Sequence, residues 1–507
     1  MSYLTASKLY DYLQCPHRVW RDIHGPQEEK ILETNPFVNL LWEKGVKHEE
    51  KIISGLGNCL NLGEGSIEDR FSKTLEAMKH GEPLIYQGVI KYENLLGIPD
   101  LLQKMSDGSY MPLDIKSGSG LEGAEEDSEE EGKPKKHYAV QLCLYNEILR
   151  KLGFANHNLG KIIDINGKEV EYLLSDMMGK RSKETWQEFY ERIKNEAAQL
   201  IQNQIANDPA MSSSCKLCPW YTSCKNWCQT SQDLTNVFYV GRSFRDRIRK
   251  DLKIANVNDF MRVSVDDVMN QKELEKKSGN KDFLSGIGES TLKKVIERTR
   301  VLYELKIPLI AEEMDFPEVE YELFFDIEDD PTQDFVYMHG IYERRVDEVR
   351  FLDFTAKEVS SEAEKEAWQN FWKYIHSLPQ NNFAVYYFSA HEKTTYKRLQ
   401  KRYPDVISVE ELTAFFEHPN TIDLYSVVLK KTDWPVGSYS IKELATYLGF
   451  KWRDETPSGA LSIQWFNEYL KTKDEAILKR ILEYNEDDCK ATMVLKDGLK
   501  TFKIGRG

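Results

Sequence analysis

The chain has 507 residues, of which 41% are hydrophobic and 30% charged, and its formal net charge is -15. This length exceeds what one hydrophobic core serves, so we expect about two to four domains of a globular protein. The sequence contains no run of about 18 apolar residues and no signal-peptide pattern, and we therefore expect a cytoplasmic protein without a membrane-spanning segment. The acidic charge argues against non-specific coating of nucleic acid, but it does not exclude a nuclease, because carboxylates that bind metal ions add negative charge.

Two helices are predicted near the start of the chain. The first spans residues 3–22, opens at Thr5 or Ser7, and loses its apolar periodicity at Cys15, which precedes a proline. The second spans residues 39–53 and contains His48 in the sequence Gly-Val-Lys-His. A lone histidine in such a helix is more often a surface residue or a satisfied residue of the core.

A pair of short strands is predicted over residues 96–118, with a turn at 106–109. Asp100 opens the first strand, and Asp114 and Lys116 share one face of the second, because side chains two apart on a strand point the same way. Carboxylates that meet there would bind Mg²⁺ or Mn²⁺, which prefer oxygen ligands. A lysine beside the metal positions the attacking water or stabilises negative charge on a phosphate. Taken alone, an Asp-x-Lys pair on a strand is more often an exposed ion pair.

The acidic, low-complexity segment at residues 121–133 is expected to be disordered. Three predicted elements follow it: a helix at 137–152, a hairpin at 161–174 and a long helix at 183–205. Gln141 and Tyr145 are four residues apart and share one face of the first of these helices, where an ordinary amphipathic surface is the alternative interpretation.

Four of the eight cysteines are crowded between Cys215 and Cys228. In a chain without export signals, such crowding favours metal or cluster ligation over disulfides. Thiolates suit both iron–sulfur clusters and Zn²⁺.

The middle of the chain, residues 231–315, is predicted to be helical and is basic in places. Gly286 and Gly288 form a Gly-x-Gly sequence before a helical run at 292–302, and the backbone N–H groups of such a helix start can bind a phosphate. This pattern resembles the hairpin of helix-hairpin-helix DNA-binding modules. A glycine turn that only packs two helices is the alternative.

A second α/β pattern begins at Tyr321, after a proline-containing linker. Asp326 and Glu328 share one face of its first strand, and Tyr484 and Asp488 share one face of its last helix. The other predicted elements are a partner strand at 335–344, a helix at 361–376, a strand at 383–389, a helix near 391 and a short helix at 440–448. Carboxylates on a strand, together with distant ones, suit two-metal cleavage of a phosphodiester, in which ions about 4 Å apart stabilise the attacking and leaving oxygens.

The motifs of the first 228 residues occur in one order: Cys15, Gly45-x-x-His48, Ile98-Pro99-Asp100, Asp114-x-Lys116, Gln141-x-x-x-Tyr145 and Cys215-x₂-Cys218-x₅-Cys224. In this order they resemble the RecB-like branch of the PD-(D/E)xK nucleases. Within it they most resemble the proteins whose nuclease core is clasped by an iron–sulfur cluster, the CRISPR-associated iron–sulfur exonucleases and the AddB-type nuclease domains.

This resemblance implies that His48, Asp100 and Asp114 bind the catalytic metal. It implies that Lys116 serves catalysis and that Gln141 and Tyr145 contact the substrate strand or brace the site. The sequence departs from the pattern in having Asp114 where glutamate is commoner, and in the acidic insertion, which would lie near the DNA path.

The cysteine array implies, by the same resemblance, a 4Fe–4S cluster with Zn²⁺ as the alternative. The four ligands would be Cys15, Cys215, Cys218 and Cys224, and Cys228 would be a spare. Ligands near both ends of the domain would tie it together, so loss of the cluster should loosen it. The other three cysteines, Cys59, Cys143 and Cys489, are predicted to be structural.

The second constellation resembles the DEDDy exonucleases of the RNase H-like fold, with Asp-x-Glu at its start and Tyr-Asn-x-x-Asp at its end. The resemblance implies that Tyr484 orients the attacking water and that Asp326, Glu328 and Asp488 hold metal. The middle motif departs from the family, where an aspartate is usual. Glu392 is the best candidate for that metal ligand, and Asp423 is a candidate for a supporting position.

The full layout resembles bacterial and archaeal RecB-like nucleases with a C-terminal RNase H-like domain. We expect an α/β protein with a restriction-endonuclease-like nuclease core with its iron–sulfur clasp at 1–230, a helix-hairpin-helix-like part at 231–315 and an RNase H-like DEDDy exonuclease at 316–507. The predicted function is a Mg²⁺- or Mn²⁺-dependent DNA exonuclease that acts on single strands or strand ends in repair, recombination or defence. A helicase is a candidate partner. A nucleic-acid-binding assembly subunit with one active centre and an RNase are the alternatives.

Overall fold

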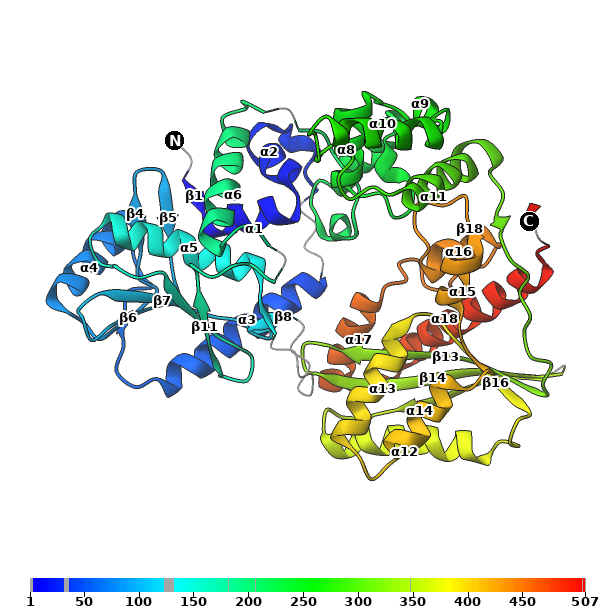
Figure 1. Cartoon of the computed structure of the whole chain (residues 1–507). Coiled ribbons are helices and arrows are strands. Elements are labelled where there is room, and N and C mark those ends of the chain that lie inside the picture. Colours follow the sequence, from blue (N-terminus) through cyan, green and yellow to red (C-terminus); the bar gives the residue numbers. More distant parts are fainter. Residues whose placement is uncertain are drawn as a thin grey trace. The chain divides into compact units, whose positions relative to one another are not determined.

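The computed structural model describes residues 3–31, 36–122, 132–180, 182–205, 207–346, 348–503 and 505–506. The chain divides into two compact units, Met1–Pro209 with Ser213–Cys224 and Ala210–Ser212 with Lys225–Gly507 (Figure 1). Most of the acidic segment predicted to be disordered, residues 123–131, lies outside the described residues. Its two ends, β8 (Leu121–Glu122) and β9 (Lys133–Pro134), pair as antiparallel strands.

The first unit is built on a six-stranded sheet in the order β11-β10-β7-β6-β3-β2. Strand β7 (Tyr110–Ile115) pairs antiparallel with β6 (Leu101–Lys104) and parallel with β10 (Leu159–Ile163). All six residues of β7 are buried, because apolar side chains of helix α3 (Pro36–Gly55) pack on one face and helix α5 (Lys136–Lys151) on the other. The remaining elements of this unit are β1 (Leu4–Thr5), α1 (Ala6–Gln14), α2 (Pro16–His24), η1 (Gln27–Glu29), β2 (Leu60–Asn61), α4 (Ile67–His80), β3 (Leu84–Tyr86), β4 (Ile90–Tyr92), β5 (Leu95–Gly97), β11 (Glu169–Leu173), α6 (Trp186–Ile201) and η2 (Ser213–Leu217).

Proline residues interrupt two of the predicted elements. The predicted helix at 3–22 is two helices, because α1 ends before Cys15 and α2 begins with Pro16, which cannot donate a backbone hydrogen bond. Thr5 caps α1 through its side chain, as the sequence predicts. The first predicted strand of 96–118 is likewise two short strands, β5 and β6, which flank Pro99 and belong to different sheets. The hairpin at 161–174 is confirmed as β10 and β11, and Gly167 in its turn has a φ of 74°.

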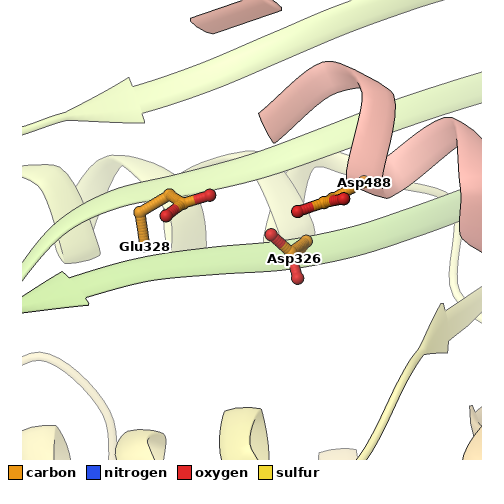
Figure 2. Close-up of side chains that lie close together, drawn as sticks. All are labelled: Asp326, Glu328 and Asp488. Carbon is orange, nitrogen blue, oxygen red and sulfur yellow. The ribbon is translucent and has the colours of Figure 1, made fainter. Parts of the chain in front are cut away.

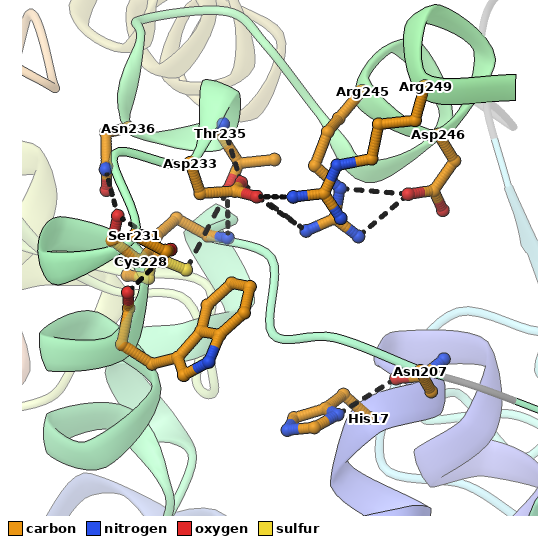
Figure 3. Close-up of polar contacts among 12 residues, drawn as sticks. His17, Asn207, Cys228, Ser231, Asp233, Thr235, Asn236, Arg245, Asp246 and Arg249 are labelled. Carbon is orange, nitrogen blue, oxygen red and sulfur yellow. Dashed lines mark hydrogen bonds and ion pairs between the residues drawn. The ribbon is translucent and has the colours of Figure 1, made fainter. Parts of the chain in front are cut away.

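Helices form the first part of the second unit. They are α7 (Tyr221–Thr230), which begins in the first unit, and η3 (Leu234–Asn236), α8 (Arg242–Leu252), α9 (Val257–Met261), α10 (Val265–Lys277), α11 (Glu289–Arg300) and η4 (Val301–Leu305). The carboxylate of Asp233 accepts a hydrogen bond from the backbone of Thr235 and pairs with Arg245 and Arg249 (Figure 3). Asp233 and Arg245 are buried, and such a buried charge is tolerated because it is both paired and hydrogen-bonded.

The second part of this unit is a five-stranded sheet in the order β15-β14-β13-β16-β17. Strands β13 (Tyr321–Asp330), β14 (Phe335–Arg345) and β15 (Glu348–Thr355) are antiparallel neighbours, whereas β16 (Phe383–Tyr387) and β17 (Thr421–Asp423) are parallel to β13. The remaining elements are β12 (Leu309–Ile310), α12 (Ser361–Ser377), α13 (Ala390–Arg402), α14 (Val409–Glu417), α15 (Leu424–Lys431), β18 (Thr432–Asp433), α16 (Ile441–Tyr447), α17 (Gly459–Thr472), α18 (Glu475–Thr501) and β19 (Gly505–Arg506). The elements predicted from residue 321 onward are all present.

Two different cores lie on the two faces of this sheet. Leu323, Phe325 and Ile327 of β13 pack with α12 and α13. Phe324, on the opposite face, packs in a cluster with Cys489 and other residues of α18. Alternation along β13 therefore turns its even-numbered residues toward α18.

Asp433 of β18 joins the helical part of the second unit to the part that contains the five-stranded sheet. This buried carboxylate lies 2.8 Å from Nε of Arg298 and 2.7 Å from Nζ of Lys294, both on α11. Phe238 stacks on Tyr439 with ring centroids 3.9 Å apart, and the Arg298 guanidinium lies over both rings.

The division into three domains stays a prediction, because the helical part and the sheet belong to one compact unit. Within the described residues, no helix is long and apolar enough to cross a membrane.

Replacement of Asp433 by asparagine is expected to lower the free energy of unfolding by about 3 kcal/mol, because Arg298 would be left buried without its partner. The measurement is urea denaturation followed by tryptophan fluorescence. The matched control is Glu289→Gln, which breaks an exposed pair with Lys293 on the same helix and should leave the midpoint unchanged. Equal effects of the two substitutions would contradict the role given to Asp433.

Candidate functional site

Three carboxylates meet in the second unit. Asp326 and Glu328 come from β13 and Asp488 from α18, and each offers a ligand atom such that all three atoms lie within 4.8 Å of one another (Figure 2). Among the described residues this is the one group of at least three metal-ligating side chains at that spacing. Carboxylate oxygens at such distances are ligands for Mg²⁺ or Mn²⁺.

The local sequence explains why these side chains converge. Residues two apart on β13 share a face, and α18 packs along that face. Asn485, one turn before Asp488, donates from its side-chain amide to Asp326 at 2.8 Å and to Glu328 at 3.4 Å. Gly340 lies opposite Asp326 on β14, and a Cβ there would be 1.7 Å from the amide oxygen of Asn485. The close approach of α18 to the sheet therefore requires a glycine at this position.

The electrostatics of the group favour a bound cation. Burial raises the pKa of Asp326 well above its usual range, and the neighbouring carboxylates of Asp488, Glu328 and Glu392 raise it further. Burial and Asp488 raise the pKa of Glu328 to about 8. A divalent ion would favour the charged forms of these groups, since opposite charge offsets both burial and mutual repulsion.

Tyr484 lies beside the three carboxylates, one helical turn before Asp488. Its side chain is buried, and its hydroxyl accepts a hydrogen bond from Nζ of Lys442 at 2.9 Å. The indole of Trp452 donates to Asp488 at 2.7 Å. The tyrosine hydroxyl and Asp488 are thus each held by a donor from outside α18.

Glu392 is buried at the start of α13 and is an electrostatic neighbour of Asp326, but it lies outside the group of three. Burial raises its pKa to about 8. Ser389, which directly precedes α13, has a φ of 118°, a strained conformation for a residue with a side chain. Asp423 accepts hydrogen bonds from the backbone of Ser389 and from the first N–H groups of α15, so it caps α15 and supports the residue that precedes α13.

In the first unit, Asp100 and Asp114 are joined through the backbone. The Asp100 N–H donates to the Asp114 carboxylate at 3.2 Å, and the Ile115 N–H donates to the Asp100 carboxylate at 2.8 Å. Burial, and then the Asp114 charge, raise the pKa of Asp100 to about 8. The two carboxylates predicted from the sequence therefore lie close together, Asp100 immediately before β6 and Asp114 on β7.

Lys116 forms an ion pair with Asp114, with Nζ 2.8 Å from the carboxylate oxygen. Burial alone would lower the pKa of Lys116, but the charges of Asp114 and Asp100 raise it above its usual value. The lysine is therefore a cation beside both carboxylates, as the predicted catalytic role requires.

Gln141 and Tyr145 lie next to each other on α5. The Gln141 amide donates to the Tyr145 hydroxyl at 2.8 Å, and that hydroxyl donates to the carbonyl of Ile98 at 3.3 Å. The tyrosine ring occupies the space that a side chain at Gly97 would need, since a Cβ there would be 2.6 Å from a ring carbon. These contacts brace the chain immediately before Asp100.

His48 and Glu49 come from neighbouring positions of α3. Nε2 of His48 lies 3.1 Å from the carbonyl oxygen of Asp164, which can only accept, so Nδ1 carries the lone pair that a metal ion would use. Glu49 was not singled out in the sequence. It accepts a hydrogen bond at 2.9 Å from Gln87, whose amide also donates to Asp100 at 3.2 Å. No local sequence pattern points to Glu49, because its link to Asp100 runs through Gln87 of another segment.

The four predicted cluster cysteines are electrostatic neighbours. The thiols of Cys15, Cys215 and Cys218 each act on the pKa of Cys224, which burial raises above its usual value. No disulfide joins cysteines in the part of the chain that the structure describes. Cys228 belongs to the second unit, where its backbone carbonyl accepts a hydrogen bond from Asn236.

Contacts between two distant stretches of sequence build this cysteine group. Trp220 donates to Asp22 at 2.9 Å, and the Arg21 guanidinium lies over the Trp220 ring at 4.5 Å. The backbone N–H of Ile31 donates to the carbonyl of Pro219 at 2.9 Å. The first helices therefore pack on the Cys215–Cys224 segment inside one unit.

Both halves of the chain match known families. Residues 17–225 match the family model of the PD-(D/E)XK nuclease superfamily, and residues 323–500 match that of the RNase_H superfamily. No curated protein matches the chain. The folds and the two carboxylate sites define a protein composed of nuclease domains. The chain is a fusion of a PD-(D/E)XK nuclease superfamily domain and an RNase H superfamily domain.

Replacement of Glu49 by glutamine is expected to lower the metal-dependent cleavage by the first unit at least about 10-fold, because its carboxylate supports Asp100 through Gln87. The measurement is cleavage of end-labelled DNA by full-length protein that carries Asp326→Asn to silence the second site. The matched control is Glu50→Gln, since Glu50 is the exposed neighbour on the same helix. Full activity of the Glu49 variant would remove this residue from the site.

Proposed function

We propose that the protein is a metal-dependent DNA exonuclease with two nuclease centres. The observation that carries the proposal is the convergence of Asp326, Glu328 and Asp488 beside Tyr484. Hydrolysis of a phosphodiester requires oxygen ligands for divalent cations and a group that orients water, and this site contains both. A second centre around Asp100, Asp114 and Lys116 would act on the same class of bond.

In the RNase H-like domain, the three carboxylates would hold Mg²⁺ or Mn²⁺, with Glu392 beside Asp326 as a fourth. Ions bound there would polarise the phosphate and promote attack by water. The hydroxyl of Tyr484 would orient the attacking water by a hydrogen bond. Asn485 and Trp452 would keep the carboxylates in place by donating to their oxygens.

In the PD-(D/E)XK domain, Asp100 and Asp114 would hold a divalent ion, with His48 Nδ1 as a nitrogen ligand and Glu49 in support. The ammonium of Lys116 would stabilise the negative charge that develops on the phosphate. Gln141 and Tyr145 would hold the strand that carries Asp100.

DNA would be held in part by the glycine hairpin before α11. Gly286 has a φ of 79°, and α11 begins after Gly288 without a side-chain cap, at residues that are exposed. Single strands or strand ends are the substrates that this proposal favours, in repair, recombination or defence, with a helicase as a candidate partner.

The test uses full-length protein with Asp114→Asn, Asp326→Asn or both, and end-labelled single-stranded DNA, double-stranded DNA and RNA of one sequence with Mg²⁺ or Mn²⁺. We expect each single substitution to remove one activity by about 100-fold or more, because each removes a metal ligand. The double variant should be inactive. Full cleavage by the double variant would refute both centres.

Two other outcomes would change the class of substrate or of protein. Preferential cleavage of RNA would make the protein an RNase. Tight binding of DNA without turnover in either metal would make it an assembly subunit.

We also propose that Cys15, Cys215, Cys218 and Cys224 hold a 4Fe–4S cluster. The support is the chemistry of the donor set: four neighbouring thiols in one unit, with Arg21 as an electrostatic neighbour of Cys224. Thiolates suit iron and zinc, and the cationic neighbour would offset the negative charge of a thiolate-bound cluster. The cluster would clasp the first helices to the segment that follows the nuclease core.

Anaerobically purified protein is expected to be brown, with about four iron atoms per chain. Cys218→Ala should lose the iron and lower the thermal midpoint of unfolding, because ligand binding is coupled to folding. Cys143→Ala, a buried cysteine outside the set, is the matched control and should keep the iron. Colourless, active protein that contains zinc would overturn the iron assignment.

A further inference from the structure

Lys442 is a cation in the second site that the sequence motifs do not include. It lies on α16, and its Nζ donates to the Tyr484 hydroxyl at 2.9 Å and to the carbonyl oxygen of Pro457 at 2.8 Å. Its Nζ also lies 5.0 Å from the centre of the Tyr484 ring. The backbone contact fixes the ammonium group at the end of a flexible side chain, so its position beside the tyrosine is well defined.

The ammonium lies beside the carboxylate group, because Tyr484, which it contacts, is one helical turn before Asp488 on α18. Two residues of the loop between α16 and α17 also contact α18: Trp452 donates to Asp488, and Arg453 donates to Asp487. The segment from α16 to α17 is therefore attached to the catalytic face of α18 at several points.

The contact between Lys442 and Tyr484 has a definite polarity. An ammonium group can only donate, so the tyrosine oxygen must accept from it. The single proton of the tyrosine then points away from the ammonium, and Asp488 lies one helical turn further along the same face of α18. If Lys442 were a neutral acceptor, the tyrosine proton would be used there instead.

We propose that Lys442 is a positioning residue of this site, which acts through Tyr484. By donating to the tyrosine oxygen, it leaves the tyrosine proton directed toward the carboxylate group, where the attacking water would lie. This inference rests on the proposed function of the second site and adds a residue to it.

The test is a double-mutant cycle in full-length protein that carries Asp114→Asn, so that only the second site is active. Lys442→Met, Tyr484→Phe and the double substitution are compared in steady-state cleavage of single-stranded DNA with Mn²⁺. We expect Lys442→Met to lower kcat about 10-fold with little change in KM. The double variant should match Tyr484→Phe alone, because a residue that acts through the tyrosine has no further effect once the hydroxyl is gone. The matched control is Lys471→Met on α17, an exposed lysine that should leave kcat unchanged.

Titration of Mn²⁺ by calorimetry gives a second readout. Lys442→Met should bind Mn²⁺ as tightly as its parent or more tightly, because a positive charge near the ligands has been removed. Weaker Mn²⁺ binding would mean that Lys442 holds the carboxylates rather than the tyrosine, and would overturn the inference. An unchanged kcat, a raised KM for DNA, or losses that multiply in the double variant would also overturn it.

Failure of the proposed function gives a different pattern. If the Asp114→Asn protein is inactive, or if adding Asp326→Asn leaves its activity unchanged, the second site is not a nuclease. If Asp326→Asn abolishes the activity and Lys442→Met does not reduce it, only the role of Lys442 is refuted.

Discussion

Asp326, Glu328 and Asp488 are held close together in the second unit, where Glu328 and Asp488 are buried and Asp326 is half-buried. Like charges at this spacing repel one another, and burial strengthens the repulsion because water is not there to screen it. Neutral donors such as Asn485 and Trp452, and the ammonium of Lys442, offset part of that cost. The repulsion that remains among the carboxylates favours binding of a divalent ion, because the charge of the ion offsets that repulsion. Stability without metal and affinity for metal are therefore opposed at this site.

The first unit offsets the same kind of repulsion with different groups. Asp100 and Asp114 accept backbone N–H groups from each other's strands, and Lys116 supplies a cation directly to Asp114. In the second unit the cation contacts a tyrosine instead of a carboxylate. The two centres thus combine carboxylates with one lysine each, but the lysine contacts a carboxylate in the first and a tyrosine hydroxyl in the second.

Local periodicity was sufficient to predict much of both sites. Alternation along β13 places Asp326 beside Glu328, and helical spacing places Tyr484 beside Asp488, because both relations depend only on residues near in sequence. Lys442 and Glu49 could not be found in this way. Lys442 reaches Tyr484 from another helix, and Glu49 reaches Asp100 through a glutamine of another segment. Contacts of this kind depend on tertiary packing, which no local pattern encodes. The break at Pro99 was missed for a related reason, since the two halves of the predicted strand join different sheets.

Gly340 has no functional group, yet the second site depends on it as much as on any carboxylate. The space that its missing side chain leaves is filled by Asn485, which in turn holds Asp326 and Glu328. Gly97 has the same relation to Tyr145 in the first unit. A random screen for loss of cleavage should therefore recover substitutions of these strand glycines as well as substitutions of the acidic residues. Substitutions that add a side chain at Gly340 or Gly97 should therefore damage these sites as much as substitutions that remove a charge.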